Sequence, residues 1–220
     1  MLWLLEAIDA IPLERLRPAL NELSEGRRER VLRARYESGK VQMILAELLL
    51  RYALLRETGR KELPGISSGE KGKPFFPEHP DLQFNLSHCK IAVACALDAS
   101  PVGVDVQSYQ PLLRKDQAAP AIFRVLSETE RSWVEQGRDA ADCDRRFAAV
   151  WTCKEAYGKA NGNGILYPLH ETAFLPAETP WEQYGWSFQC QLLPRAALTV
   201  CAAAPMELRP VRLPELLGSE

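Results

Sequence analysis

The hydrophobic pattern of this chain changes period three times, and that order restricts the fold more than any other feature. Between about residues 38 and 58, apolar side chains recur at i, i+3, i+4, i+7, i+8 and i+11, the pattern of a helix with one broad buried face. Strand-like runs follow at residues 82–86, 91–97 and 102–106. Helical patterning then returns over residues 112–161, with further strand-like runs at 186–192 and 197–203. Helices then strands, twice over, predict an α+β fold with two similar halves.

Local signals predict where these elements end and where the chain divides. Ser38 is a candidate N-cap and Gly59 a candidate stop for the first long helix, and we expect the fifty or so N-terminal residues to be helical. Residues 98–101 are rich in turn formers, so we expect them to join the flanking strands as a hairpin. We place the boundary of the two halves there, with residues 1–101 in one and 102–220 in the other.

Composition excludes several classes of protein. Of 220 residues, 46% are hydrophobic and 25% are charged, which is typical of a folded globular chain. The net charge of −2 argues against a surface made to bind nucleic acid or anionic membrane throughout. No apolar run approaches the roughly 20 residues of a membrane span, and the N-terminus lacks the basic flank of a signal peptide. We therefore expect a soluble, cytoplasmic protein without a membrane or nucleic-acid partner.

The cysteines indicate neither a disulfide framework nor a zinc site. Their spacing is irregular, and no C-x-x-C pair is present. We expect reduced, structural thiols at Cys89, Cys95, Cys143, Cys153, Cys190 and Cys201.

Three segments carry residues suited to chemistry. On the expected helix of residues 151–159, Trp151, Glu155 and Lys159 are spaced four apart and share one face. An anchoring tryptophan followed by a surface ion pair is the simpler interpretation of that segment alone.

The second segment is the strand that contains Asp105. Alternation places its valines on one face and Gly103, Asp105 and Gln107 on the other. Carboxylate and amide oxygens are ligands that Mg²⁺ prefers. The alternative is a solvated face without a ligand.

The third segment is the loop Gly69-Glu-Lys-Gly-Lys-Pro74, followed by Asn85-Leu-Ser-His88. Glycines let backbone N–H groups approach a ligand closely, and lysines suit phosphates. The spacing of a Walker A loop is absent, and a solvated flexible loop is the alternative. Taken together, the three segments could hold one Mg²⁺ beside a polyphosphate, as enzymes that transfer a phosphate-linked group do.

These motifs, in this order, resemble the 4′-phosphopantetheinyl transferases of the Sfp type. The resemblance rests on Gly72-Lys-Pro74, Asn85-Leu-Ser-His88, Val102-Gly-Val-Asp-Val-Gln107 and Trp151-Thr-Cys-Lys-Glu-Ala-Tyr-Gly-Lys159. It implies two pseudo-symmetric α+β halves with the active site at their interface. It also implies Mg²⁺-dependent transfer of the 4′-phosphopantetheine arm of coenzyme A (CoA) to a serine of an apo acyl or peptidyl carrier protein, with release of adenosine 3′,5′-bisphosphate. A monomer is expected, because both halves lie in one chain.

The resemblance also assigns roles to residues. Asp105 and Glu155 would ligate Mg²⁺, Glu155 would accept the proton of the carrier serine, and Lys159 would neutralise the diphosphate. Gln107 stands where many members have a third acidic ligand, so a weaker metal site is expected. CoA would be bound by Arg30, Gly72, Lys73, Pro74, Asn85, Ser87, His88 and Lys159.

Two further expectations follow from the resemblance. The long first helix has Gln42 where members usually carry an arginine toward the 3′-phosphate of CoA, with Lys40 nearby. The carrier is expected to dock on residues 111–115 and 121–124, which combine apolar and basic side chains. The alternatives to an enzyme are a catalytically weak CoA- or carrier-binding module, for which Gln107 is the warning sign, and a structural protein.

Overall fold

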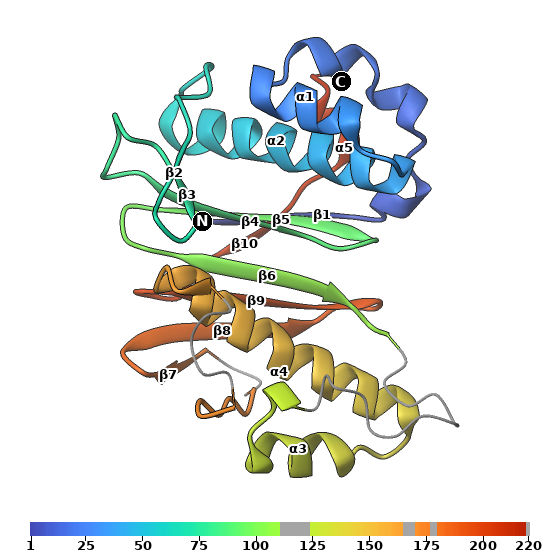
Figure 1. Ribbon diagram of the computed structural model, residues 1–220, viewed down its shortest axis with the longest axis vertical. Coiled ribbons are helices and arrows are strands. Elements are labelled where there is room, and N and C mark those ends of the chain that lie inside the picture. Colours follow the sequence, from blue (N-terminus) through green and yellow to red (C-terminus); the bar gives the residue numbers. More distant parts are fainter. Residues whose placement is uncertain (111–123, 165–169, 177–179, 219–220) are drawn as a thin grey trace.

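The computed structural model stacks helices, a sheet, a second sheet and further helices in that order (Figure 1). It describes residues 1–110, 124–164, 170–176 and 180–218. Within these residues, the two large sheets have strand orders β10-β1-β5-β4 and β6-β9-β8-β7, and β2 pairs with β3 in a short ribbon. The mixed helices and sheets confirm the predicted α+β class.

The first half carries one long helix over its sheet. Its strands are β1 (Leu2–Glu6), β2 (Ser67–Ser68), β3 (Pro74–Phe75), β4 (Gln83–His88) and β5 (Ala92–Asp98). Its helices are α1 (Glu25–Arg33) and α2 (Glu37–Thr58), preceded by short 3₁₀ turns at Ile8–Ala10, Leu13–Leu16 and Pro18–Asn21. Gly59 ends α2 in the left-handed region, at φ 73°, as predicted. The N-cap is Tyr36, so the prediction of Ser38 was wrong.

The second half repeats the combination of a sheet and a long helix. Its sheet contains β6 (Gly103–Ser108), β7 (Trp181–Gln183), β8 (Trp186–Leu192) and β9 (Ala196–Ala202). Its helices are α3 (Glu128–Glu135) and α4 (Ala140–Ala160). The remaining elements, β10 (Leu208–Pro210) and α5 (Leu213–Leu216), follow β9 but join the first half.

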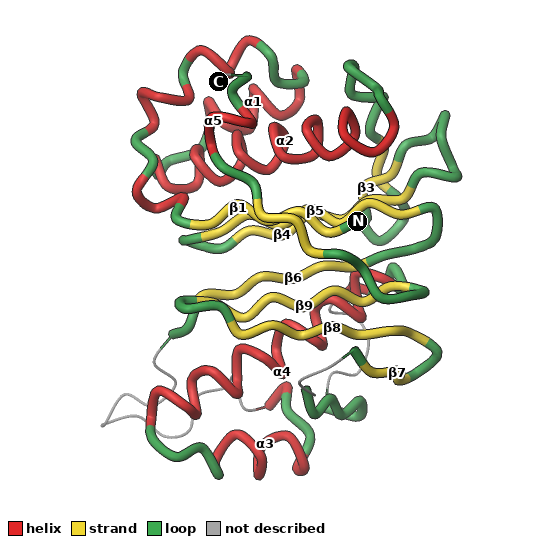
Figure 2. Tube along the Cα trace, turned by 180° about the vertical axis from the view of Figure 1, so that it is seen from behind, coloured by secondary structure: helices red, strands yellow, loops and turns green. Residues whose placement is uncertain are grey.

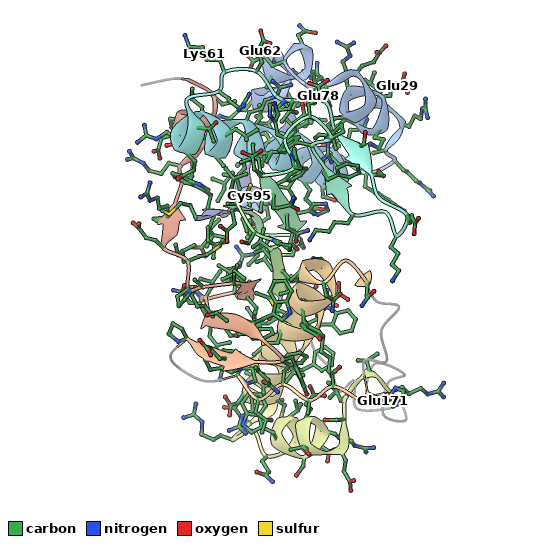
Figure 3. All side chains as sticks on the ribbon, turned by 90° about the vertical axis from the view of Figure 1, so that its left-hand side faces the viewer. Glu29, Lys61, Glu62, Glu78, Cys95 and Glu171 are labelled. Atoms are coloured by element: carbon green, nitrogen blue, oxygen red, sulfur yellow. The ribbon has the colours of Figure 1, made fainter. Side chains whose placement is uncertain are left out.

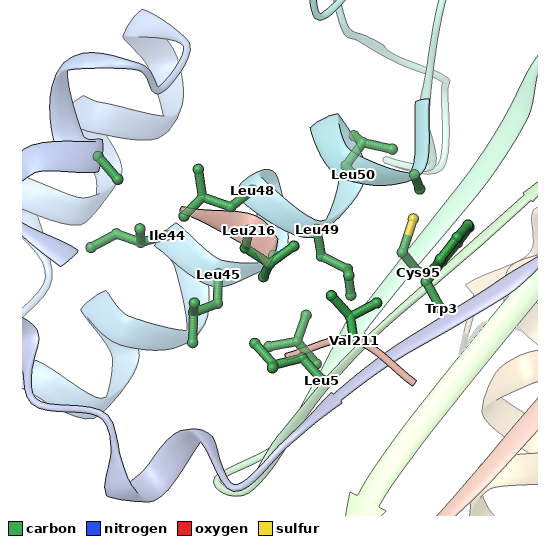
Figure 4. Packing of buried hydrophobic residues seen from close by; sticks show 14 of the residues in the cluster. Trp3, Leu5, Ile44, Leu45, Leu48, Leu49, Leu50, Cys95, Val211 and Leu216 are labelled. Atoms are coloured by element: carbon green, nitrogen blue, oxygen red, sulfur yellow. The ribbon is translucent and has the colours of Figure 1, made fainter. Parts of the chain in front are cut away.

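The first core lies between α2 and its sheet (Figure 4). Leu45 and Leu49 of α2 are fully buried and belong to one cluster with Trp3 of β1 and Cys95 of β5. The predicted helical stripe is therefore the face that α2 turns toward the sheet. Figure 3 shows Cys95 inside this half, whereas Glu29 and Glu62 point outward.

The second core fills the space between the two sheets. Small apolar side chains of β5 meet the valines of β6, namely Val102 just before the strand, Val104 and Val106. This contact confirms that the valines face the core. It also turns Gly103, Asp105 and Gln107 toward α4, so the interpretation of that face as simply solvated was wrong.

Two further sequence expectations differ from the structure. Residues 98–101 do not form a hairpin turn, because β5 pairs with β1 and β4 whereas β6 pairs with β9. The N-terminal region is not helical throughout, since it begins with β1. The division into residues 1–101 and 102–220 stays a prediction, but the C-terminal segment crosses it. Figure 2 shows this segment passing from the second sheet through β10, which lies parallel to β1, to α5.

All six cysteines are free, as the sequence predicts. None of the helices in the described ranges is both long and apolar enough to cross a bilayer.

Candidate active site

The predicted site forms where α4 crosses β6. A Cβ atom on Gly103 would lie far inside van der Waals contact of the Ala156 carbonyl oxygen, so only glycine lets the helix backbone approach the strand this closely. The close approach brings Lys159, in the last turn of α4, to Asp105 in the middle of β6.

Lys159 is the centre of a polar cluster. Its Nζ atom lies 2.5 Å from Oδ1 of Asp105 and also donates to the Val104 carbonyl oxygen, at 3.1 Å. Ser87, from β4 of the first half, donates from Oγ to the same Oδ1 atom at 2.7 Å. Asp105 is only 6% exposed, so these contacts compensate a buried charge. The cluster therefore joins the two halves.

Glu155 lies one helical turn before Lys159, on the same face of α4. Its side chain is half-buried, and in the described part of the chain its carboxylate has no hydrogen bond or ion pair. Burial raises the pKa of Glu155, and the nearby Asp105 carboxylate adds to this, while Lys159 opposes it. The two carboxylates are therefore near enough to interact electrostatically, and their sharing of one metal site stays a prediction.

A cleft of about 340 Å³ opens beside this cluster. Its walls come from both halves and include six of the predicted CoA-binding residues, Gly72, Lys73, Pro74, Asn85, His88 and Lys159. The lysine and proline follow Gly72, which adopts a left-handed φ of 82°. Ser87 is not among the lining residues, because it lies behind the wall at 7% exposure.

Positive charge gathers at the His88 end of the cleft. Desolvation lowers the pKa of His88, and the cations of Arg27 and Lys159 lower it further. Arg27 lines this cleft and also a neighbouring cavity of about 560 Å³, whereas Arg30 lines only the neighbouring cavity. Arg27 is thus a site residue that the sequence analysis missed beside the predicted Arg30.

Glu47 is a second residue that the sequence analysis missed. Its carboxylate is 1% exposed and accepts hydrogen bonds from Ser24 N, at 2.6 Å, and Arg51 Nη2, at 3.0 Å. It also lies 3.6 Å from Arg27. The sequence contains one sign of this role, since Glu47 is a single carboxylate among the apolar residues of the α2 stripe. Glu47 holds Arg27 at the cleft.

Lys73 has a structural contact as well as a place in the cleft wall. Its Nζ atom donates to the carbonyl oxygens of Val102, at 3.2 Å, and Ala160, at 3.1 Å. Burial lowers its pKa. The lysine thereby ties the glycine-rich loop to β6 and to the end of α4.

The donor set at the cluster fits a hard divalent cation. Asp105 of β6 and Glu155 of α4 offer carboxylates that interact electrostatically, and Glu155 lacks a partner among the described residues. Gln107 is half-buried, and its Nε2 atom donates to the Ser108 carbonyl oxygen at 3.2 Å. The described residues contain no group of three or more His, Cys, Asp or Glu side chains able to hold a metal. Protein oxygens alone would thus give an incomplete coordination shell.

The predicted carrier dock falls largely outside the described residues. Residues 111–115 and 121–123 belong to a segment that the structure does not describe, and Arg124 is the one predicted docking residue within the described ranges. Arg124 is exposed.

Comparisons with known proteins agree with this geometry. A family model described as the 4′-phosphopantetheinyl transferase superfamily matches residues 101–201. The 4′-phosphopantetheinyl transferase Sfp of Bacillus subtilis (strain 168) is 28% identical over 83% of each chain. The 4′-phosphopantetheinyl transferase AcpT of Salmonella typhi is 31% identical over 70% of this chain and 76% of its own length. A further 4′-phosphopantetheinyl transferase of Bacillus subtilis is 30% identical over 67% of this chain, and the match spans 63% of that relative. The chain therefore belongs to the 4′-phosphopantetheinyl transferases of the Sfp type.

Proposed function

We propose that this enzyme transfers the 4′-phosphopantetheine arm of CoA to a serine of an apo acyl or peptidyl carrier protein, with Mg²⁺, and releases adenosine 3′,5′-bisphosphate. The observation that carries this proposal is the cleft between the halves. Its lining includes Arg27, His88 and Lys159, and Lys159 contacts the Asp105 carboxylate behind the lining. CoA presents a diphosphate and a separate 3′-phosphate, and these cations suit both groups.

Different residues in and beside the cleft suit different parts of CoA. Arg27 and His88 suit the 3′-phosphate, because guanidinium groups bind phosphate in a bidentate way. Gly72, Lys73 and Pro74 line the wall beside them and suit the adenosine. Asp105 and Glu155 would hold Mg²⁺ on the diphosphate, with Gln107 or water completing the shell. When bound, Mg²⁺ would neutralise charge that builds on the diphosphate.

In the transfer, the serine oxygen of the carrier forms a bond to the phosphorus that bears pantetheine. The bond from that phosphorus to the bridging oxygen breaks, and the electron pair leaves with adenosine 3′,5′-bisphosphate. Glu155 accepts the serine proton, and burial, which raises the pKa of its carboxyl above the usual value, makes it a stronger base. Lys159 stabilises the charge on the leaving diphosphate oxygen.

The proposal extends to the docking of the carrier protein, the oligomeric state and the cellular location. An acidic carrier would dock near Arg124 and the preceding segment, which the sequence makes basic and apolar. Because each half supplies part of one cleft, a single chain is sufficient, and we propose a monomer that acts in the cytoplasm.

The test is the modification of purified apo carriers. Wild-type protein with CoA and Mg²⁺ should add the mass of one phosphopantetheine group to a carrier serine, seen by intact-protein mass spectrometry. Removing Mg²⁺ with EDTA, or the change Glu155→Gln, should abolish this gain. The matched control is Glu62→Gln, since Glu62 is exposed on the outside of the first half (Figure 3). CoA binding without mass gain on any acyl or peptidyl carrier would instead favour the CoA- or carrier-binding module.

A further inference from the structure

Lys71 is an exposed cation of the cleft lining to which the proposed function gives no role. It lines the cleft of about 340 Å³ and also a second cavity of about 460 Å³, which lies beside the glycine-rich loop and the end of α4. Its Nζ atom donates to Oδ1 of Asn163 at 2.5 Å. The lysine belongs to the first half and Asn163 to the second, so this hydrogen bond connects the halves beside the cleft.

The charge of Lys71 is less compensated than the charges of its neighbours in the cleft lining. Arg27 and Lys159 each form an ion pair with a buried carboxylate. Lys73 donates to two backbone carbonyl oxygens. Within the described ranges, Lys71 has no carboxylate partner, and its one hydrogen bond goes to a neutral amide. Its positive charge therefore remains available to an anion in the cleft.

The two side chains are carried by hydrogen-bonded turns. In the glycine-rich loop, Gly69 N–H donates to the Lys73 carbonyl oxygen at 2.9 Å, and Gly72 N–H donates to the Gly69 carbonyl oxygen at 2.8 Å. After α4, the backbone N–H of Asn163 donates to Oδ1 of Asn161 at 2.8 Å. The backbone thus holds both residues in place, while the four-carbon stem of a lysine stays flexible.

A phosphate group is a stronger partner for this ammonium group than the amide is. The bond to Asn163 joins a cation to a neutral oxygen, whereas a bond to phosphate adds the attraction between opposite charges. Lys71 already lines the cleft, so its flexible stem can carry the ammonium group from the amide to an anion bound there. The amide loses little, because it is exposed and water can replace the lysine.

We propose that Lys71 is a further CoA-binding residue, which Asn163 holds beside the cleft in the free enzyme and which a phosphate group of CoA takes over on binding. This inference rests on the proposed function. It makes Asn163 a competitor of the ligand for one ammonium group. The two residues should therefore have opposite effects on CoA affinity, although they share one hydrogen bond.

The experiment measures the Kd of CoA by calorimetry in EDTA, without a carrier protein. Lys71→Met should weaken binding by about threefold to tenfold and make the Kd less dependent on salt concentration, because it removes an exposed charge. Asn163→Ala should tighten binding by about twofold to fivefold, because it releases the lysine and keeps the backbone N–H that bonds Asn161. The double variant should bind CoA like Lys71→Met alone.

The matched control is Lys61→Met, which removes an exposed lysine outside the cleft lining (Figure 3) and should change the Kd by less than about twofold. Weaker binding in both Lys71→Met and Asn163→Ala would show that the hydrogen bond between the halves supports binding, and it would overturn the proposal. Unchanged affinity in Lys71→Met would overturn it as well. An unchanged Kd in Asn163→Ala would show that the amide does not compete for the lysine, and it would overturn the exchange of partners.

The inference and the proposed function fail in different ways. A wild-type protein that binds CoA but modifies no carrier would contradict the proposed function and leave the Lys71 comparison intact. Wild-type binding of CoA with an unchanged Kd in Lys71→Met would contradict only the role of Lys71. Dephospho-CoA, which lacks the 3′-phosphate, identifies the phosphate involved. An equal effect of Lys71→Met on both ligands assigns the lysine to the diphosphate, and an effect on CoA alone assigns it to the 3′-phosphate.

Discussion

At the scale of single residues, His88 shows how the cleft suits an anion. Burial holds the pKa of the imidazole below the usual value of about 6.5, and the nearby cations Arg27 and Lys159 lower this pKa further. A phosphate placed beside it would supply the missing negative charge and favour the imidazolium form. CoA binding and protonation of His88 should therefore be coupled.

We expect CoA binding to take up protons through His88 at about pH 6.5. The bound pKa exceeds the free pKa, so affinity should rise as pH falls through the bound value and level off below the free value. Calorimetry in two buffers of different ionisation enthalpy would show the uptake, and His88→Gln should reduce it. Equal uptake in wild type and His88→Gln would contradict this coupling. His79→Gln is the control, since this histidine lies outside the cleft lining.

The sequence predicted these residues unevenly. Strand alternation correctly turned Asp105 away from the valines, and helical spacing put Glu155 beside Lys159. The family resemblance gave Arg30 and left out Arg27, because within one basic helix the sequence does not show which arginine faces the cleft. Arg27 is placed by its ion pair with Glu47 of another helix, a contact that no local sequence pattern contains.

At the scale of elements, the site depends on how closely α4 lies on β6. The helix backbone contacts the strand at Gly103, and Lys73 reaches from the first half to the Ala160 carbonyl at the end of the same helix. Small displacements of α4 would move Glu155 and Lys159 together, because both are on its last turns.

Gly103→Ala should therefore lower both stability and activity. The added Cβ must push α4 away from β6, and overpacking of this kind costs about 1–3 kcal/mol or more. Urea denaturation would measure the loss of free energy of unfolding, and the carrier assay should show a reduced kcat in the protein that remains folded. Gly39→Ala in α2 is the control, since its Cβ would meet no atom within 4 Å, and it should not destabilise the protein. Equal effects of the two changes would contradict the close-approach argument.

A buried ion pair fixes the other side of α4. Lys154 and Glu130 are both 0% exposed, with Nζ and Oε2 2.9 Å apart, and Glu130 also accepts hydrogen bonds from the backbone of Ser127 and Phe174. Lys154 donates in addition to the Thr172 carbonyl oxygen. The pair thus joins α3, α4 and residues 172–174.

Lys154→Met should destabilise the protein by about 3–5 kcal/mol, because it leaves the Glu130 carboxylate buried without a cation. The free energy of unfolding from urea titration gives the value. Arg33→Met is the control: it breaks the exposed pair with Glu29, and losses there are about 1 kcal/mol or less. Equal losses of free energy of unfolding in the two variants would show that the buried ion pair stabilises the protein no more than the exposed pair.

The elements also show the limit of local sequence patterns. Helical periodicity predicted α2 to within one residue, because a helix is stabilised by contacts three and four residues apart. The hairpin expected at residues 98–101 was wrong, since the turn residues are present but both strands find partners elsewhere. β1 and β10 are likewise specified by distant pairing, and short apolar runs do not reveal it.

At the scale of the whole molecule, the C-terminal segment connects the two halves by a second route. The chain first passes from β5 to β6 and later returns from β9 to β10, which pairs with β1. Val211, Leu213 and Leu216 then belong to the same core cluster as the buried side chains of α2. Figure 4 shows Val211 and Leu216 among these side chains. The core of the first half therefore includes residues from the C-terminal end of the described chain. The sequence alone indicated a boundary between the halves near residue 101 and gave no sign of this contribution.

This closure predicts that the first half loses stability when the C-terminal segment is weakened. Leu216 is 9% exposed, and removing its buried methyl groups in Leu216→Ala should cost about 2–4 kcal/mol. For a chain of this size that corresponds to a fall in Tm of roughly 4–16 °C, measured by differential scanning calorimetry. Leu192→Ala is the matched control, because Leu192 is 53% exposed and its loss should change stability by about 0.5 kcal/mol or less. If Leu216→Ala melts like Leu192→Ala, α5 does not contribute to the core, and the second connection would not stabilise the cleft between the halves. If it melts lower while saturating CoA restores part of the loss, the segment supports the same folded state that binds the ligand, as linkage requires.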